Sequence, residues 1–184
     1  MNKLPAIVIA IGSILFLIAA FMPITTVFVI ERDVARVQSR LGEWNASLTL
    51  FGLGGLATAV GLGLLTLQLR GATNAAASGY LGFAAMALGA VCWSVIIYLR
   101  YSLPLETVFK EPTFGWWFIA YTLLTQAALI AYGFALFRAG YPRWLGLGTI
   151  GLAAASFSAY LVFKDMPPFA HYVITFVIGV SLLF

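Results

Sequence analysis

The residues of this chain that could take part in chemistry are few, and most of them are isolated. His171 is the single histidine, and Asp165 is the acid nearest to it in the sequence. One histidine cannot supply both axial ligands of a bis-histidine haem, and a metal site would need further ligands beside it. No serine or cysteine stands with this pair in a nucleophilic arrangement. We therefore interpret His171 first as a polar residue near a membrane surface, and second as one axial ligand to a haem or chlorin pigment.

The most polar stretch inside an apolar segment carries Tyr121, Thr122 and Gln126. Thr122 and Gln126 are spaced one helical turn apart, so they share a helix face, and Gln126 falls near the middle of the segment. Side chains of this kind commonly join helices in lipid through hydrogen bonds worth about 0.6 kcal/mol each. The alternative is the wall of a pocket for the head of a lipid or a quinone. We favour the hydrogen-bonding interpretation and keep the pocket as the alternative.

An arginine row occurs in the longest polar stretch of the chain. Arg32, Arg36 and Arg40 recur at intervals of one helical turn, and apolar residues recur at helical spacing between them. This pattern predicts an amphipathic helix over residues of about 30–44 that lies flat on the membrane, with Trp44 at the depth of the headgroups. The simpler interpretation is a connector between two spans. The sharper one is a docking platform for a partner, formed by the three arginines and Trp44.

Carboxylates occur in two polar stretches that we expect on one side of the membrane, as Glu31, Asp33, Glu43, Glu106 and Glu111. Paired carboxylates can bind metals or transfer protons. Each of these acids, however, has an arginine or lysine within a few positions. Ion pairs in contact with water therefore explain them more simply.

The composition places the protein in a membrane. Of its 184 residues, 62% are hydrophobic and 9% are charged, and the mean hydropathy is +1.02. Soluble domains are about 45–50% apolar and about 25% charged, so this chain has too little polar surface to face water throughout. The net charge of +4 comes from ten basic residues that stand singly between apolar segments. That distribution indicates loops beside membrane spans rather than a nucleic-acid-binding surface.

The apolar segments predict an all-α, polytopic membrane protein with six transmembrane helices and an interfacial amphipathic helix after the first, in one transmembrane domain. The predicted spans are residues of about 4–21, 48–69, 79–99, 114–137, 144–163 and 169–184. The first is longer than the apolar part of a signal peptide and lacks a cleavage site, so we expect it to be retained. The last is shorter than the about 20 residues that a spanning helix needs, so it either ends near the far interface or continues beyond Phe184.

Rows of small residues predict how the spans pack, because small side chains let helices approach closely in lipid. We expect the rows in the second and third spans to bring those two helices together. A further row lies in the fifth span. The rows comprise Gly52, Gly55, Ala59 and Gly63, then Gly82, Ala85 and Gly89, and then Gly148, Gly151, Ala155 and Ser158. The short basic turn from Arg138 to Trp144 predicts an antiparallel hairpin of the fourth and fifth spans.

Charges in the connections predict the orientation. With six spans, Lys3, Arg70, Arg138 and Arg143 share the side of both termini without any acid, and all the acids fall on the other side. Lys and Arg in short loops mark the cytoplasmic side. We therefore expect both termini in the cytoplasm.

Part of the C-terminal third resembles a pattern in uncharacterised bacterial multi-pass membrane proteins. The residues that carry the resemblance are Tyr132–Arg138, Gly140–Gly146 and Met166–Pro168. In the pattern a helix ends in arginine, a turn of the Pro-Arg-Trp type follows, and a glycine-rich helix comes next. The resemblance implies a bacterial inner-membrane protein and carries no activity with it.

The six predicted spans carry no Lys, Arg, Asp or Glu near their centres. Ion-coupled transporters and proton pumps usually hold their ion or proton on such groups, so we do not expect a proton- or sodium-driven transporter. We expect a non-enzymatic accessory or scaffold subunit that packs against larger membrane proteins of a complex. The alternative is a binder or passive carrier of a hydrophobic small molecule, namely a lipid, quinone or pigment. An enzyme ranks last, and the expected partners are the bilayer and other membrane-protein subunits rather than nucleic acid.

Overall fold

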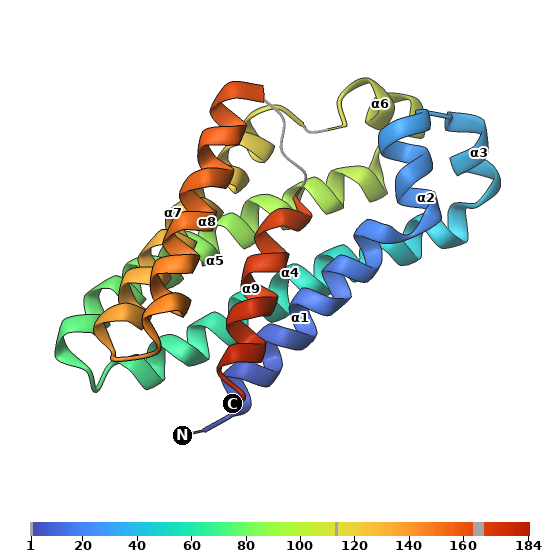
Figure 1. The fold of residues 1–184 in the computed structure, drawn as a ribbon. Helices are drawn as coiled ribbons and strands as arrows, with labels where there is room; N and C mark the ends of the chain where they lie inside the picture. The colour runs from blue at the N-terminus through green and yellow to red at the C-terminus, as the bar shows by residue number, and fades with distance from the viewer. Residues whose placement is uncertain (1, 113, 164–167) are drawn as a thin grey trace.

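The computed structural model describes residues 2–112, 114–163 and 168–184, and their regular secondary structure is entirely helical (Figure 1). In chain order the elements are α1 (Leu4–Phe21), α2 (Pro23–Thr26), the π-helical turn η1 (Val27–Glu31), α3 (Val34–Ser39), α4 (Leu41–Leu69), α5 (Thr73–Ser102), α6 (Leu105–Lys110), α7 (Trp116–Arg138), α8 (Arg143–Phe163) and α9 (Phe169–Ser181). The all-α prediction is confirmed for these residues.

Within the described ranges, α1, α4, α5, α7 and α8 are the five helices long and apolar enough to cross a membrane. The architecture is that of a membrane protein with several spans, as the composition predicts. The helix α9 is also apolar but has 13 residues. Its length is therefore about 20 Å at 1.5 Å per residue, against a hydrocarbon core of about 30 Å.

The short helix α9 runs along α1 in the opposite direction. At its start, the ring of Phe169 lies 5.5 Å from the ring of Phe21, measured between centroids. Near its end, Gly179 faces the backbone of Ala10, where an added side-chain carbon would lie 2.8 Å from the amide nitrogen. The two ends of the chain consequently lie close together at one end of the bundle (Figure 1).

Glycines set the closest helix contacts. A side-chain carbon at Gly54 of α4 would lie 2.6 Å from the backbone nitrogen of Phe16 in α1, and one at Gly82 of α5 would lie 3.3 Å from the backbone carbonyl oxygen of Ala128 in α7. The helix backbones therefore approach closely between α1 and α4 and between α5 and α7, as they also do between α9 and α1.

The second and third predicted spans, now α4 and α5, also meet, but not in the expected way. Gly55 and Gly63 of α4 face the rings of Trp93 and Phe83 from α5, whose nearest atoms lie 3.2 Å and 2.7 Å from an added side-chain carbon. Large side chains of α5 thus pack against the glycines of α4 and keep the two helix backbones apart. The prediction of a close contact between the two small-residue rows is wrong.

The predicted hairpin of α7 and α8 is confirmed. A side-chain carbon at Gly133 of α7 would lie 2.8 Å from the carbonyl oxygen of Gly146 in α8. In the turn between them, Gly140 has φ +82°, a backbone conformation that favours glycine.

The small-residue row predicted in the fifth span points away from the rest of the chain. Gly148 and Gly151 of α8 have no atom within 4 Å of an added side-chain carbon. Ala155 and Ser158 are also exposed. We call these four residues the outer face of α8.

The surface helix predicted over residues of about 30–44 is divided, so this prediction is wrong in its extent. Arg32 adopts φ 52°, which breaks the helix. Asp33 then accepts a hydrogen bond from the backbone N–H of Arg36 at 3.0 Å and caps α3, the usual way for aspartate to start a helix. The next long helix already begins at Leu41, before the expected start of the second span. We call α2, η1, α3 and α6 the cap, because together they cover one end of the bundle (Figure 1).

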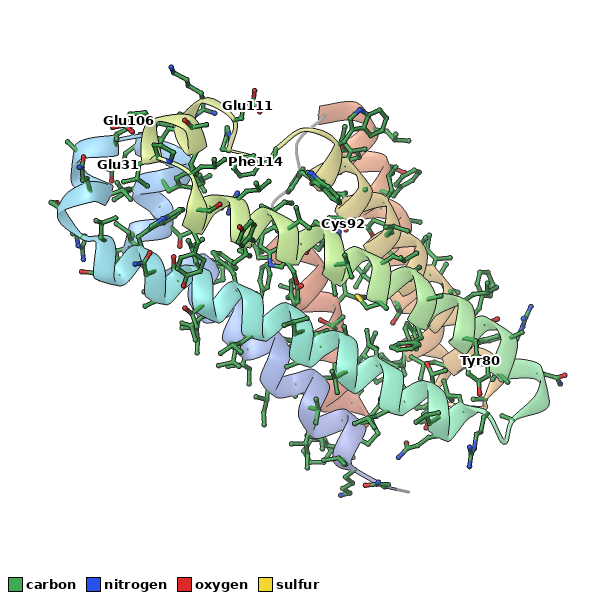
Figure 2. The ribbon with its side chains drawn as sticks, turned by 180° about the vertical axis from the view of Figure 1, so that it is seen from behind. Glu31, Tyr80, Cys92, Glu106, Glu111 and Phe114 are labelled. Carbon is green, nitrogen blue, oxygen red and sulfur yellow. The ribbon has the colours of Figure 1, made fainter. Side chains whose placement is uncertain are left out.

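The two ends of the bundle carry different charges. At the end that holds the termini, Gln68 at the close of α4 donates a hydrogen bond to the carbonyl oxygen of Asn2 at 2.7 Å. The basic residues near this end are Lys3, Arg70, Arg138 and Arg143. The acids of the described chain lie in or beside the cap, where Figure 2 shows Glu31, Glu106 and Glu111 far from Tyr80. Among the described residues, one end of the bundle is therefore purely basic and the other carries both acids and bases.

Candidate ligand-binding site

A cavity of about 400 Å³ lies where α1, α4 and α5 meet the cap. Aromatic rings form most of its inner wall, and they come from elements far apart in the sequence. These rings belong to Phe16, Phe28, Trp44, Phe51, Trp93 and Phe118. We call this space the cap cavity.

The rings of the wall hold one another in place. Phe16 lies at the centre, with its ring centroid 4.7 Å from that of Phe51 and 5.4 Å from that of Trp93. Phe28 from η1 packs 4.7 Å from Trp44 of α4. Edge-to-face and tilted arrangements at these distances are favourable for aromatic pairs. The wall is therefore formed before any ligand arrives.

One cation reaches this aromatic wall. Arg100 lines the cavity from the last turn of α5, with its guanidinium carbon 5.1 Å from the ring centroid of Phe28 and 5.8 Å from that of Trp93. Its Nη2 donates a hydrogen bond to the carbonyl oxygen of Pro112 at 2.6 Å. Its Nε is buried and has no hydrogen-bond partner among the described residues. The guanidinium thus keeps donor capacity that the described residues do not use.

The charges around the cavity are all positive among the described residues that line it. Arg32 is the second charged residue of the lining, beside Arg100, and the lining contains no carboxylate. The neighbouring arginines of the cap are neutralised locally, because Arg36 pairs with Glu31 and Arg40 pairs with Glu43. Among the described residues, the predicted ion pairing is thus found for Glu31 and Glu43 but not for Asp33, Glu106 or Glu111. These pairs leave the cavity itself without a counter-ion from the described chain.

One edge of the cavity is apolar and exposed. Phe21, Val29 and Ile30 line it, and their exposed fractions are 69%, 59% and 74%. In a membrane protein, large apolar side chains exposed to this degree face lipid. The cavity therefore has an exposed apolar edge beside the cap.

The four residues predicted as a site lie beneath the cap cavity rather than in its lining. Tyr121, Thr122, Gln126 and His171 are all buried. Tyr121 and His171 come together, with ring centroids 5.6 Å apart in an edge-to-face contact. The ring centroid of Tyr121 also lies 4.9 Å from that of Trp93, so Tyr121 packs behind a residue of the cavity wall.

Within this lower group, some polar atoms have no partner in the described chain. The hydroxyl of Thr122 and the Nε2 of His171 are buried without a hydrogen bond there, while Nδ1 of His171 lies 3.1 Å from the carbonyl oxygen of Pro168. Asp165, considered above as a neighbour of His171, lies outside the described residues, as do Met166 and Pro167. Thr122 and Gln126, the residues of the alternative pocket-wall interpretation, do not line the cap cavity, and Phe118 is the residue of this helix that does.

The predicted docking residues are distributed differently from the expectation. Arg32 and Arg36 are exposed and Arg40 is partly buried. Trp44 is 2% exposed and packs on Phe28 inside the cap. A docking role for Trp44 at the headgroup surface is therefore wrong, because its ring already serves the core.

Sequence reasoning missed Arg100 as a site residue. The predicted third span ends at residue 99, which leaves Arg100 in a loop. The structure extends this helix to Ser102, just before Pro104. The available signal was the spacing of Trp93 and Arg100, which puts an aromatic ring and a guanidinium on one face two turns apart.

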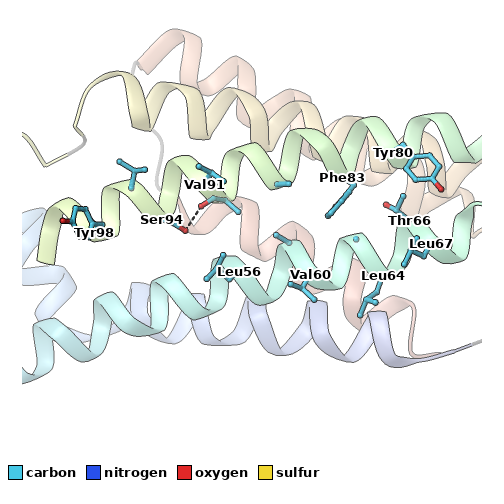
Figure 3. Close-up of a pocket in the computed structure, with 15 residues that line it drawn as sticks. Leu56, Val60, Leu64, Thr66, Leu67, Tyr80, Phe83, Val91, Ser94 and Tyr98 are labelled. Carbon is cyan, nitrogen blue, oxygen red and sulfur yellow. Dashed lines mark hydrogen bonds between the residues drawn. The ribbon is translucent and has the colours of Figure 1, made fainter. Parts of the chain in front are cut away.

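A second, larger cavity of about 700 Å³ runs between α4 and α5 (Figure 3). Tyr98 and Tyr80 mark its two ends in the figure, and Leu56 and Val60 line it between them. Ser94 also lines this cavity, but its hydroxyl donates a hydrogen bond to the carbonyl oxygen of Ala90 in the same helix at 2.8 Å. This apolar groove offers little that would orient a ligand, so we regard the cap cavity as the better candidate site.

Fold and site together define a multi-span α-helical membrane protein with an aromatic, arginine-bearing cavity at one end of its bundle. Comparisons with protein-family models, with curated proteins and with solved structures find no match for this chain. Its function must therefore be argued from the site.

Proposed function

We propose that this protein is a non-enzymatic membrane protein that holds a hydrophobic small molecule, of the lipid, quinone or pigment class, in the cap cavity. The observation that carries the proposal is the cavity of about 400 Å³ walled by aromatic rings. Small-molecule sites typically measure about 300–1,000 Å³ and combine an apolar, aromatic lining with a few polar groups. The cap cavity has this size and this chemistry.

The position of the cavity supports a ligand that arrives from the membrane. Its exposed edge of Phe21, Val29 and Ile30 borders lipid, and its inner wall is shielded by the cap. An amphiphile can enter along the apolar edge without crossing water. This route suits a binder or passive carrier.

We further propose that the protein lies in a bacterial inner membrane with six crossings and both termini in the cytoplasm. The pairing of α9 with α1 supports the sixth crossing, because α9 follows α1 back to the end that holds the N-terminus. The purely basic end supports the orientation, since Lys and Arg in short loops favour the cytoplasmic side.

A fluorescence experiment tests the proposed function. Of the five tryptophans, Trp44 and Trp93 line the cavity, and the others are exposed. A reporter variant with the exposed Trp116, Trp117 and Trp144 replaced by phenylalanine retains only the two cavity tryptophans. We expect dibrominated stearate or the matching brominated monoacylglycerol, added to neutral nanodiscs, to quench this fluorescence.

The control for this assay fills the cavity. Ala20 lines the cap cavity, so Ala20→Phe in the reporter variant should abolish most of the quenching. If both probes quench the reporter variant and its Ala20→Phe form equally, the bromine atoms reach the tryptophans from bulk lipid. That result would refute the proposal.

The second candidate function is that of an accessory or scaffold subunit beside larger membrane proteins. The outer face of α8 favours it, because Gly148 and Gly151 present a small-residue surface that no described residue of this chain covers. Small-residue faces of this kind commonly contact other helices in membranes. The two functions are compatible, since the cap cavity and this face use different helices.

A further inference from the structure

The charge state of the cap cavity bears on the kind of molecule that it holds, and this inference rests on the proposed function. Arg100 and Arg32 line the cavity, and no carboxylate lies within 4.0 Å of Arg100 among the described residues. Arg100 is partly buried, with its Nε fully buried, and a guanidinium partly withdrawn from water without a counter-ion among the described residues is costly. An anion bound in the cavity would remove this cost.

The contacts that Arg100 makes with the described residues use only part of its donor capacity. Nη2 is engaged by the carbonyl oxygen of Pro112, and Nε is buried without a partner in the described chain. The rings of Phe28 and Trp93 contribute cation–π attraction but accept no conventional hydrogen bond. A guanidinium presents five N–H donors in a planar fork that matches carboxylate and phosphate oxygens.

A comparison with Arg138 shows that Arg100 is in a distinct environment. Arg138 also lies near an aromatic ring, 5.8 Å from the centroid of Phe134, but it is exposed at the opposite end and bonds to the hydroxyl of Ser78. Water can solvate Arg138. Arg100 instead faces an aromatic cavity.

We infer that the molecule held in the cap cavity is a membrane amphiphile with an acidic head group, a carboxylate or a phosphate monoester. Its head group bonds to Arg100 inside the cavity, with Arg32 adding positive potential from the cap. Its acyl chain leaves along the exposed apolar edge formed by Phe21, Val29 and Ile30. The positive charge of the two arginines favours an acidic head group. The apolar edge favours a molecule with an acyl chain over a free anion.

The test compares probes that share one chain and differ in the head group. In neutral nanodiscs, the tryptophan reporter variant is titrated with dibrominated stearate, with the lysophosphatidic acid of the same chain, and with the uncharged monoacylglycerol. A charge-assisted hydrogen bond contributes about 1.5–3 kcal/mol, so the acidic probes should bind about 10- to 100-fold more tightly than the neutral one. Inorganic phosphate alone should not compete.

Variants assign the preference to Arg100. Arg100→Gln should bring the acidic probes to the affinity of the neutral probe while quenching by the neutral probe persists. Arg100→Lys should retain part of the preference, because it keeps the charge and loses the planar fork. Arg138→Gln, the matched control, should leave all affinities unchanged. The comparison of probes on the reporter variant itself needs no change at Arg100, so the inference stays testable even if Arg100→Gln fails to fold.

The outcomes separate this inference from the proposed function. Equal affinity for acidic and neutral probes, lost in Ala20→Phe, would overturn the inference and leave the proposed function standing. A preference for acidic probes that survives Arg100→Gln would also overturn it. Displacement by inorganic phosphate would show a site for free anions rather than for an amphiphile. Failure of every probe to quench would refute the proposed function as well.

Discussion

Arg100 and Trp93 lie two turns apart on one face of α5, and the guanidinium carbon of Arg100 is 5.8 Å from the centroid of the Trp93 ring. Because of this spacing, α5 places the guanidinium of Arg100 beside the aromatic wall of the cap cavity. Trp93 also contacts Phe16, Phe51 and Tyr121, so it joins the cavity wall to the core of the bundle.

Truncation of Trp93 should destabilise the fold. Its ring is 2% exposed, and its Nε1 donates a hydrogen bond to the carbonyl oxygen of Phe51 at 3.3 Å. We expect Trp93→Ala to lower the free energy of unfolding by about 3–5 kcal/mol, the usual cost of removing a large buried aromatic side chain. Reversible denaturation in mixed micelles measures this. Trp144→Ala, at a residue 61% exposed, is the control and should cost far less; equal losses would contradict the assignment of Trp93 to the core.

The contact of α1 with α4 should tolerate no side chain at Gly54. An added carbon would lie 2.6 Å from the backbone nitrogen of Phe16 and 2.8 Å from the carbonyl oxygen of Gly12, and backbone atoms cannot move aside cheaply. We expect Gly54→Ala to cost at least about 1–3 kcal/mol through overpacking. Gly151→Ala in α8 meets no atom within 4 Å and should be neutral or stabilise by up to about 1 kcal/mol. Thermal unfolding of the two variants decides the matter, and a Gly54→Ala variant as stable as the parent would contradict this packing.

A hydrogen-bond network should join α4 to α7. The hydroxyl of Tyr132 lies 2.7 Å from that of Thr66 and donates to the carbonyl oxygen of Leu62 at 2.8 Å. Interhelical hydrogen bonds in membranes are worth about 0.6 kcal/mol on average and up to about 1.7 kcal/mol. Tyr132→Phe should therefore lower the free energy of unfolding by an amount in this range. Tyr98→Phe, at an exposed tyrosine, is the control and should change the free energy of unfolding little. Equal effects of the two variants would show that the network does not stabilise the fold.

The outer face of α8 should affect assembly without affecting the fold. Because Gly151 has no neighbour within the chain, Gly151→Leu should leave the isolated protein folded. If the accessory-subunit function holds, the same change should reduce the recovery of larger membrane proteins that co-purify after mild solubilisation. Unchanged recovery in Gly151→Leu would count against this second function. Gly133→Leu, which meets the backbone of α8, is expected to unfold the hairpin instead.

The sequence was sufficient to predict the membrane class, the approximate positions of the five long apolar helices and the hairpin of α7 and α8, because these depend on long apolar runs and on local turn chemistry. The break at Arg32 was harder to foresee, since the apolar periodicity continues through it. Asp33, which caps α3, is a residue type that often begins a helix. The prediction gave more weight to the continuous amphipathic pattern than to this signal.

The site was less predictable than the fold. The polar residues of the fourth span, Tyr121, Thr122 and Gln126, drew attention because polar side chains are rare in apolar segments, yet they lie below the cavity. The cavity wall is made of aromatic residues such as Phe16 and Phe51, whose types are equally typical of any core. Only tertiary packing shows that they surround a space and that Arg100 faces it.

The most direct test of a ligand in the cap cavity is native mass spectrometry of the protein extracted from its own membrane in a mild detergent. We expect the unmodified protein to retain a bound amphiphile. Ala20→Trp, which fills the cap cavity, should lose it, whereas Ala87→Trp, in the groove between α4 and α5, should keep it. Retention of the same molecule by Ala20→Trp and its loss from Ala87→Trp would contradict the account and place the ligand in the groove.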